Sequence, residues 1–538
     1  MEWRRIDPVA PHDGRKKEHI IDDDRVGESE PPQDSSSGPG NGRRVVSLYR
    51  HPLAAAGAAL VVAGGMAFIF LVVQDFTSET ENPYRSLITF IAIPAVVGLG
   101  AFIFLLSIRI QVVSARKRGE RVAFRIEPTD PRYMRSLWLF LALSAAGVAV
   151  VGFVGFQAYE ATDSTSFCGD ACHTPMEPQA VAHQESAHAR VKCVECHIGP
   201  GTEAYIDAKI NGMKQLWGVL TDTYDRPVET PIEMRSAEAI CEECHWRDNF
   251  LGTKVRSATY YSLDDASSPW TVNFLFDLGD AGSTPDQPGG VHWHTSGGTV
   301  VEYIATDHEL QDIPWVRVIE EDGTEREYTT PGEYVPLASD SASVVRRFDC
   351  LDCHNRPAHP LEPASRSINN ALSNGIIPDI LPEIKDIAMQ VLLNGYEDRD
   401  AAHQGIPDSL QAFYATEYPD AAEAYPTEID EAARALIDIY DVNFFPEMKT
   451  DYRARQYNIG HLSWEGCFRC HDGEKADESG SVISNECNVC HLIVGQGPGT
   501  SGVLLDLDVS GLEFEHPYGV SDWRERSCAS CHAELDGM

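Results

Sequence analysis

Positive charge is scarce in this chain. Its 538 residues include 43 Lys and Arg against 82 Asp and Glu, which gives a formal net charge of −39. The shortage lies after residue 156, where 25 basic and 66 acidic residues leave a net charge near −41. Such a field repels anionic partners, nucleic acid among them, and attracts cationic ones. Solubility or adaptation to salt is the alternative explanation for the acidic surplus.

No cysteine is left over once the pairs are counted. All 14 cysteines fall into seven pairs, and a histidine directly follows each pair. The motifs are Cys168/Cys172-His173, Cys193/Cys196-His197, Cys241/Cys244-His245, Cys350/Cys353-His354, Cys467/Cys470-His471, Cys487/Cys490-His491 and Cys528/Cys531-His532. C-x-x-C-H is the attachment pattern of c-type haem: two thiols form thioethers, and the adjacent imidazole binds the iron. We therefore expect seven covalently bound haem c groups.

A disulfide framework and a set of zinc sites are the alternatives for an even number of cysteines outside the cytosol. Neither explains why a histidine follows every pair when the chain has only 19 His. The first motif departs from the pattern, because three residues separate Cys168 from Cys172. Gly169 provides backbone freedom that can absorb the extra residue.

A cleaved signal peptide is the alternative for the first apolar run, but about 50 residues precede that run and no small-x-small cleavage pattern stands out, so we expect an uncleaved anchor. Apolar runs at 53–73, 87–108 and 137–156 are each about 20 residues long, which is enough to span a bilayer. Pro94 lies inside the second run and is expected to bend it. We predict a membrane anchor of three transmembrane helices over residues 51–157, preceded by a disordered tail at 1–50.

The loops between these runs predict the orientation. The loop 109–136 carries eight Lys and Arg, whereas residues 74–86 contain one Arg and three acidic residues. Loops rich in Lys and Arg stay on the cytoplasmic side. The N-terminus and the basic loop are then cytoplasmic, and everything after Phe156 lies on the other side. All seven motifs lie there, on the oxidising, periplasmic side of a bacterial inner membrane, where a cationic redox carrier fits the acidic charge.

We expect the part after the anchor to be mainly α-helical with a small β insertion. Apolar residues at three- and four-residue spacing predict a helix at 205–220. Residues 271–276 and 299–334 are rich in Val, Tyr, Thr and Ile and predict strands, and 364–393 and 408–440 are expected to be helical. The predicted modules are a three-haem module at 158–250, a β-rich insertion at 251–349 and a four-haem module at 350–538.

Each iron needs a sixth ligand or an open face, and the remaining histidines are the candidates. Those on short tethers to a motif, or placed together on one predicted strand, are His183, His188, His292, His294, His359, His461 and His516. Met176 follows His173 by three residues and is a candidate thioether ligand of the first iron. The alternative for each histidine is an ordinary surface side chain, and for Met176 it is packing. His308 and His403 are expected to be surface residues.

Two groups of motifs resemble a known family. Cys-His-Thr-Pro-Met176, Ser186-Ala-His188 and Ala208-Lys-Ile-Asn-Gly-Met-Lys-Gln-Leu-Trp217 resemble the NapC/NirT/NrfH family of membrane quinol dehydrogenases. Gly290-Val-His-Trp-His294, Cys350-Leu-Asp-Cys-His-Asn-Arg-Pro-Ala-His359 and Asn458-Ile-Gly-His461 are similar to the larger heptahaem inner-membrane cytochromes of metal-respiring bacteria. Together, the resemblance covers most of the chain after Phe156.

The resemblance implies that the chain oxidises a quinol, with menaquinol as the expected substrate, at the haem nearest the membrane. It implies that Lys209 contacts the quinol and that Met176 binds the first iron. The electrons are then passed to periplasmic c-type cytochromes or other cationic carriers. Two rivals remain open: a passive electron conduit within a larger complex, and a terminal multihaem reductase of a nitrogen or sulfur oxyanion, which would need a haem with an open face.

Overall fold

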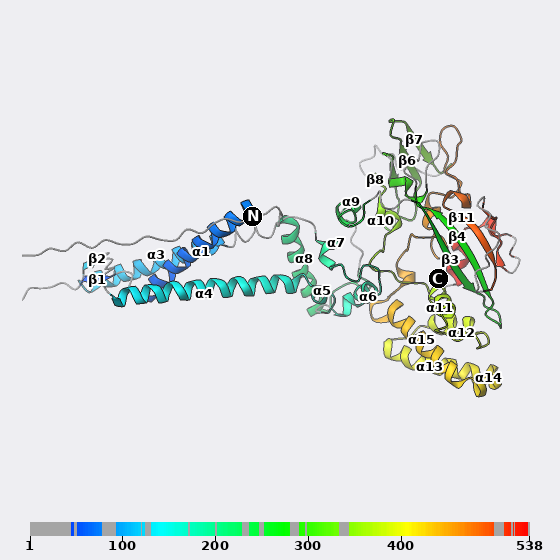
Figure 1. The fold of residues 1–538 in the computed structure, drawn as a ribbon, viewed down its shortest axis with the longest axis horizontal. Coiled ribbons are helices and arrows are strands. Elements are labelled where there is room, and N and C mark those ends of the chain that lie inside the picture. Colours follow the sequence, from blue (N-terminus) through cyan, green and yellow to red (C-terminus); the bar gives the residue numbers. More distant parts are fainter. Residues whose placement is uncertain are drawn as a thin grey trace, which may run out of the picture. The chain divides into compact units, whose positions relative to one another are not determined.

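The computed structural model describes residues 45–47, 51–77, 93–119, 121–123, 131–170, 173–198, 202–228, 236–246, 252–279, 290–295, 298–332, 344–499, 511–517, 520 and 522–535 (Figure 1). The chain divides into two compact units. The first comprises Met1–Ala63 with Val96–Ser144, and the second comprises Gly64–Ala95 with Ala145–Met538. The predicted tail at 1–50 falls outside the described residues except for 45–47, which form a short strand.

Long helices account for most of the described residues of the first unit. They are α1 (Pro52–Thr77), α3 (Ile93–Lys117) and α4 (Pro131–Thr162), and each of them has residues in both units. Pro52–Ile69 and Ile93–Lys117 are long and apolar enough to cross a membrane. They overlap the first two predicted runs, 53–73 and 87–108, of which 87–92 lie outside the described residues. The third predicted run lies within α4, and its passage through a membrane stays a prediction. Strands β1 (Val45–Ser47) and β2 (Arg121–Ala123) pair in parallel.

Two glycines allow α1 and α3 to approach closely. A Cβ atom at Gly57 would lie 2.5 Å from the backbone nitrogen of Phe104, and one at Gly100 would lie 2.6 Å from the Cβ atom of Leu60. Contacts of this kind, with glycine where two backbones meet, are typical of helices that associate in a bilayer. The packing of these two helices is therefore consistent with a membrane anchor.

Short helices carry most of the motifs in the second unit. In chain order they are α5 (Thr165–Asp170), α6 (His173–Gln184), α7 (Cys193–His197), α9 (Ala237–Ile240), α10 (Cys350–Cys353), the 3-10 turns η7 (Gly466–Arg469) and η8 (Cys487–Val489), and α16 (Ala529–Leu535). The longer helix α8 (Thr202–Thr221) lies between the second and third motifs. It confirms the helix predicted at 205–220.

Two small antiparallel sheets follow. The first has the order β11-β4-β3, with β3 at Thr253–Tyr261, β4 at Pro269–Asp277 and β11 at His491–Pro498. The second has the order β7-β6-β5-β8, with β5 at Val300–Ile304, β6 at Trp315–Ile319, β7 at Glu325–Thr329 and β8 at Arg346–Arg347. The strands predicted at 271–276 and within 299–334 are confirmed. Strand β11 comes from the C-terminal part and begins at the histidine of the sixth motif, so it ties that motif to the insertion.

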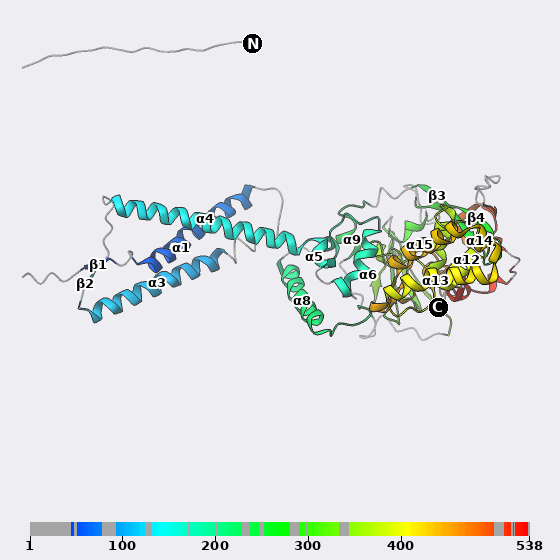
Figure 2. The same cartoon turned by 90° about the horizontal axis from the view of Figure 1, so that it is seen from below.

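The main apolar core is helical and contains no Cys-His motif. It is built from α11 (Ala364–Ser373), α12 (Ile384–Leu392), α13 (Arg399–Glu417), α14 (Pro419–Ala424) and α15 (Pro426–Asn443). Both ribbon views show α13 and α15 side by side (Figures 1 and 2). The helical segments expected at 364–393 and 408–440 are confirmed, with breaks. Pro419 and Pro426 each begin a new helix, because proline lacks the N–H group that would continue the previous one.

The prediction that His292 and His294 lie on a strand is wrong. Both residues belong to the 3-10 turn η4 (Val291–Thr295). The tight turn brings the ring Nδ1 of His294 to 3.0 Å from the carbonyl of Val291. The remaining short elements are β9 (Phe444–Phe445), β10 (Thr450–Asp451) and the 3-10 turns η5 (Pro446–Met448), η6 (Tyr452–Ala454) and η10 (Trp523–Glu525).

The helical core gives a direct stability prediction. Ile406 on α13 is fully buried, whereas Ile376, which follows α11, is 59% exposed. Ile406→Ala should lower the free energy of unfolding by about 2–5 kcal/mol because it leaves a cavity, and Ile376→Ala should change it by less than about 1 kcal/mol. Chemical denaturation followed by circular dichroism measures both variants. Equal effects would show that the helices do not share one packed core.

Candidate haem-binding cavity

A single large cavity runs through the second unit. Its volume is about 4390 Å³, several times the roughly 300–1,000 Å³ of a pocket for one drug-sized ligand. Motif residues that line it are Cys168, Cys193, Cys196, His197, Cys241, Cys244, His245, Cys350, Cys353, His354, Cys467, His471, Cys487, Cys490, His491, Cys528, Cys531 and His532. The cavity is therefore large enough for several bulky groups, and the motif side chains face it.

The local backbone explains how each motif presents its side chains. In four motifs the N–H group of the histidine donates to the carbonyl of the first cysteine, at 2.7 Å for His245, 2.8 Å for His354, 3.0 Å for His471 and 2.9 Å for His532. These bonds close one helical turn. Residues three or four apart in a turn share one side, so both thiols and the imidazole are presented together.

The fourth motif is held by a capping box. The side chain of Asp349 accepts from the backbone N–H of Leu351, and the side chain of Asp352 accepts from the backbone N–H of Asp349 at 2.6 Å. The hydroxyl of Tyr303 donates to Asp352 at 2.5 Å, and burial raises the pKa of Asp352 to about 6. Asp349 also accepts from the backbone of Ala237 at 3.2 Å. This last bond connects the fourth motif to the third, which begins at the end of α9.

Neighbouring motifs meet through their cysteines. The thiols of Cys168 and Cys193 lie within interaction range of each other. The same holds for Cys241 with Cys350 and for Cys467 with Cys490. The motifs therefore lie close together inside the cavity, and the groups that they hold would be close neighbours too.

The alternatives of a disulfide framework and of zinc sites find no support in the described part of the chain. None of the thirteen cysteines described there forms a disulfide. No cluster of three or more His, Cys, Asp or Glu with metal-binding geometry occurs among the described residues. Cys172 lies outside them.

Pairs of imidazole rings face one another at a regular distance. A metal–imidazole nitrogen bond is about 2.0 Å and the ring centre lies roughly 1 Å further, so two imidazoles on opposite sides of one iron have centres about 6 Å apart. The observed centre-to-centre distances are 6.0 Å for His188–His245, 6.1 Å for His197–His359, 5.9 Å for His294–His471, 6.3 Å for His461–His491 and 6.1 Å for His516–His532. Each pair joins one motif histidine to one candidate distal histidine.

Three further candidate iron ligands are not assigned to one of these ring pairs. His292 is within electrostatic range of His354 in the fourth motif. His183 is buried, lies 6.1 Å from His359, and its Nε2 is 3.0 Å from the carbonyl of Val191. Met176 is half-buried on α6 and lines the cavity.

For seven of the histidines, burial favours the neutral form, which is the form that binds iron. Burial lowers the pKa of His294, His359 and His491 to about 4, and it lowers the pKa of His197, His354, His461 and His532 below the usual value. A neutral imidazole keeps a lone pair for a metal. The thiols, the ring spacing and the neutral rings all fit haem c.

Lys209 lies in a polar group beside the first motif. Its Nζ donates to Asp163 Oδ1 and to Thr162 Oγ1, both at 3.0 Å. The side chain of Asp163 is only 7% exposed. Both charged groups are within electrostatic range of the Cys168 thiol. The sequence indicated Lys209 through a resemblance but did not indicate Asp163, whose only signal is its position five residues before Cys168.

Motifs, cavity and ring pairs together define a c-type cytochrome. The family model described as the NapC/NirT cytochrome c family, N-terminal region, matches residues 131–248. The cytochrome c-type protein ImcH of Geobacter sulfurreducens is 36% identical over 498 residues, which is 91% of this chain and 96% of that protein. No solved structure matches the chain. The chain belongs to the NapC/NirT cytochrome c family, and it is a membrane-associated electron-transfer protein that binds haem c covalently.

A glycine in front of the fifth motif provides a test of this local geometry. Gly466 has φ +52°, and an added Cβ atom would overlap the carbonyl oxygen of Gly460. Gly480 has φ +84° but nothing within 4 Å of such an atom. Gly466→Ala should lower the free energy of unfolding by more than about 3 kcal/mol, and Gly480→Ala by about 1–3 kcal/mol from backbone strain alone. Thermal unfolding compares them, and equal losses would contradict the close approach at Gly466.

Proposed function

We propose that this chain carries seven covalently attached haem c groups, oxidises a membrane quinol and passes the electrons to a redox partner on the outer side of the membrane. The observation that carries this proposal is the Lys209–Asp163 pair beside the first motif. It combines a cation, a buried carboxylate and a neighbouring redox group, the three elements that oxidation of a quinol requires.

The ring distances support an assignment of ligands. His197 pairs with His359, His245 with His188, His471 with His294, His491 with His461, and His532 with His516. His292 is assigned to the fourth motif, where it is near His354. His183 has the same distance to His359 as His197 has; His197 is assigned to the pair because it belongs to a motif, and His183 stays a candidate ligand without an assigned iron. When bound, haem c supplies one-electron chemistry with a potential set by its ligands and burial.

The first motif needs a separate assignment. His173 and Met176 are the first and fourth residues of α6. Both are assigned to the first iron: His173 because it directly follows the cysteine pair, and Met176 because the family resemblance implies a methionine ligand there.

The quinol site lies between α8 and the end of α4. Apolar side chains on α8 that are 41–73% exposed are Ile206, Ile210, Met213, Leu216, Trp217 and Leu220. A quinol ring is apolar and has two hydroxyl groups, so this surface suits the ring and the polar pair suits the hydroxyls. Lys209 Nζ donates to one quinol oxygen, and the Asp163 carboxylate accepts a hydroxyl proton.

The membrane anchor and the net charge of the chain indicate where the protein lies and which partner accepts its electrons. Three helices, α1, α3 and α4, cross the inner membrane of a bacterium with the N-terminus in the cytoplasm. Menaquinol is the expected substrate. The excess of 66 acidic over 25 basic residues after residue 156 favours a cationic partner such as a periplasmic c-type cytochrome.

Anaerobic mixing with a menaquinol analogue tests the function. Purified, oxidised protein in detergent is mixed with the quinol, and the haem α-band is followed. Rapid reduction that is blocked by a quinol-site inhibitor is expected. Full reduction by dithionite without any reduction by quinol would overturn quinol oxidation and favour a conduit or a terminal reductase.

Replacement of Lys209 tests the polar pair. A hydrogen bond to a charged group contributes about 1.5–3 kcal/mol, so Lys209→Ala should slow reduction by quinol about 10- to 100-fold and leave haem content intact. Lys214→Ala is the matched control, because Lys214 is exposed on the same helix and lies about 140° around it. Stopped-flow rates that are equal in both variants would remove Lys209 from the site.

Replacement of a distal histidine tests the ligand assignment. His461→Met should convert one bis-histidine iron to histidine–methionine ligation, which raises its potential and adds a sulfur-to-iron charge-transfer band. His308→Met is the control, since His308 is exposed and belongs to none of the ring pairs. Potentiometric titration and near-infrared absorption measure both effects. If the two variants give the same spectrum, the pairing of His461 with His491 is wrong.

A further inference from the structure

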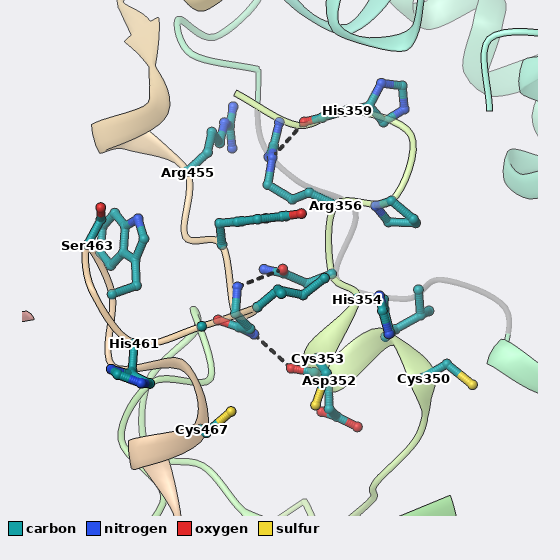
Figure 3. Close-up of a pocket in the computed structure, with 18 of the residues that line it drawn as sticks. Cys350, Asp352, Cys353, His354, Arg356, His359, Arg455, His461, Ser463 and Cys467 are labelled. Atoms are coloured by element: carbon teal, nitrogen blue, oxygen red, sulfur yellow. Dashed lines mark hydrogen bonds between the residues drawn. The ribbon is translucent and has the colours of Figure 1, made fainter. Parts of the chain in front are cut away.

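Arg356 is a buried cation on the loop between the fourth motif and His359. Its Nε donates to the carbonyl of His359 at 2.8 Å (Figure 3). Its Nη2 is buried and has no hydrogen-bond partner. Within the described residues no carboxylate forms an ion pair with this guanidinium, whereas Arg366 nearby in the sequence pairs with Glu362 at 3.0 Å.

Arg455 lies beside it and has the same charge. It follows η6 and donates from Nη2 to the carbonyl of Val228. Arg356 is buried within electrostatic range of Arg455. Figure 3 shows the two guanidinium groups next to each other, and both side chains line the large cavity. The sequence segments that carry them, 350–359 and 452–455, are far apart in the chain.

A bound anion would stabilise the two neighbouring guanidinium groups of Arg356 and Arg455. Burial of a cation without a partner costs several kcal/mol, and a second cation adds repulsion. Planar guanidinium groups bind carboxylates through two parallel hydrogen bonds. An unsatisfied Nη2 that lines the cavity is a donor of that kind.

We propose that Arg356 and Arg455 together form a binding site for the carboxylates of porphyrin propionate side chains. The proposal rests on the proposed haem attachment and identifies what this pair does for it. Arg356 stands two residues after His354 and three before His359, the ligands assigned to two different irons. The pair therefore neutralises propionate charge at the point where two of the attached groups come together.

Neutralisation has a measurable consequence. A carboxylate near an iron favours the ferric state, and a cation that binds the carboxylate offsets this effect. Loss of the cation should shift the midpoint potential of at least one haem to a lower value. It should also change the vibrations of the propionate, because its hydrogen bonds are lost.

The test compares Arg356→Gln, Arg356→Lys and Arg434→Gln. Arg434 is exposed on α15, so its replacement removes the same charge away from the cavity. Haem content is measured first by pyridine haemochrome, and a wild-type chain without covalent haem would refute the proposed function and not this pair alone. Each variant is then examined by potentiometric titration and by resonance Raman spectroscopy of the propionate bending band.

Arg356→Gln should shift the bending band and lower a midpoint potential. Arg356→Lys should shift the band and keep most of the potential, because lysine keeps the charge but not the two parallel bonds. Arg434→Gln should change neither. A lower potential with an unshifted band would overturn the proposal, because Arg356 would then act only as a distant charge. If the Arg356→Gln variant loses haem, the Arg356→Lys variant becomes the test. An unshifted propionate bending band in that variant would overturn the proposal.

The carboxylate has a second possible source in solution. The measurements are therefore repeated in chloride buffer and in chloride buffer with added acetate. A band that is the same in both buffers supports the propionate. A variant effect that requires acetate would assign the site to a free carboxylate and would overturn the proposal.

Discussion

Two imidazole rings that bind one iron from opposite sides have to lie about 6 Å apart, centre to centre. Five pairs of a motif histidine with a candidate distal histidine satisfy that distance. His197 and His359, for example, are separated by the whole β-rich insertion. Much of the second unit is therefore arranged so that a distal histidine reaches a motif. The short turns that carry the motifs impose a second geometric requirement, because they place both thiols and the motif imidazole on the same side of the turn.

The spacing required between paired imidazole rings also explains why long helices and strands lie mostly outside the motif segments. The apolar core is concentrated in α11–α15, with a smaller cluster in the β5–β6 region. The segments that carry the motifs enclose the cavity instead, and they consist largely of single helical turns and 3-10 turns. Attached porphyrins are large and apolar, so they can supply the buried area that these segments lack. The helical part has no such requirement and packs as an ordinary helical domain.

The sequence predicted what local chemistry determines and missed what distant contacts determine. The motifs and the helix at 205–220 follow from spacing, and the distance of a histidine from a cysteine predicts candidate distal ligands, several of which form the ring pairs described above. His292 and His294 were misplaced on a strand, because Val, Trp and Thr favour strands while the contact with the fifth motif requires a 3-10 turn. The partner of His359 could not be read from the sequence, since His183 and His197 are both plausible by spacing. Asp163 was missed because its role depends on Lys209, 46 residues later.

The structure shows that several of the few positively charged residues are buried. The part of the chain after residue 156 has 25 basic residues, and some of them are buried although arginine and lysine are rarely buried. Lys385 is 2% exposed and donates to Ser365, and Arg469 is 7% exposed and donates to the carbonyls of Gly466, Leu310 and Asp352. Arg356 and Arg455 add two more cations along the cavity. Cations along the cavity suit the anionic propionates that we propose they bind, and the excess of acidic residues in the same part of the chain suits the cationic redox partner that we propose.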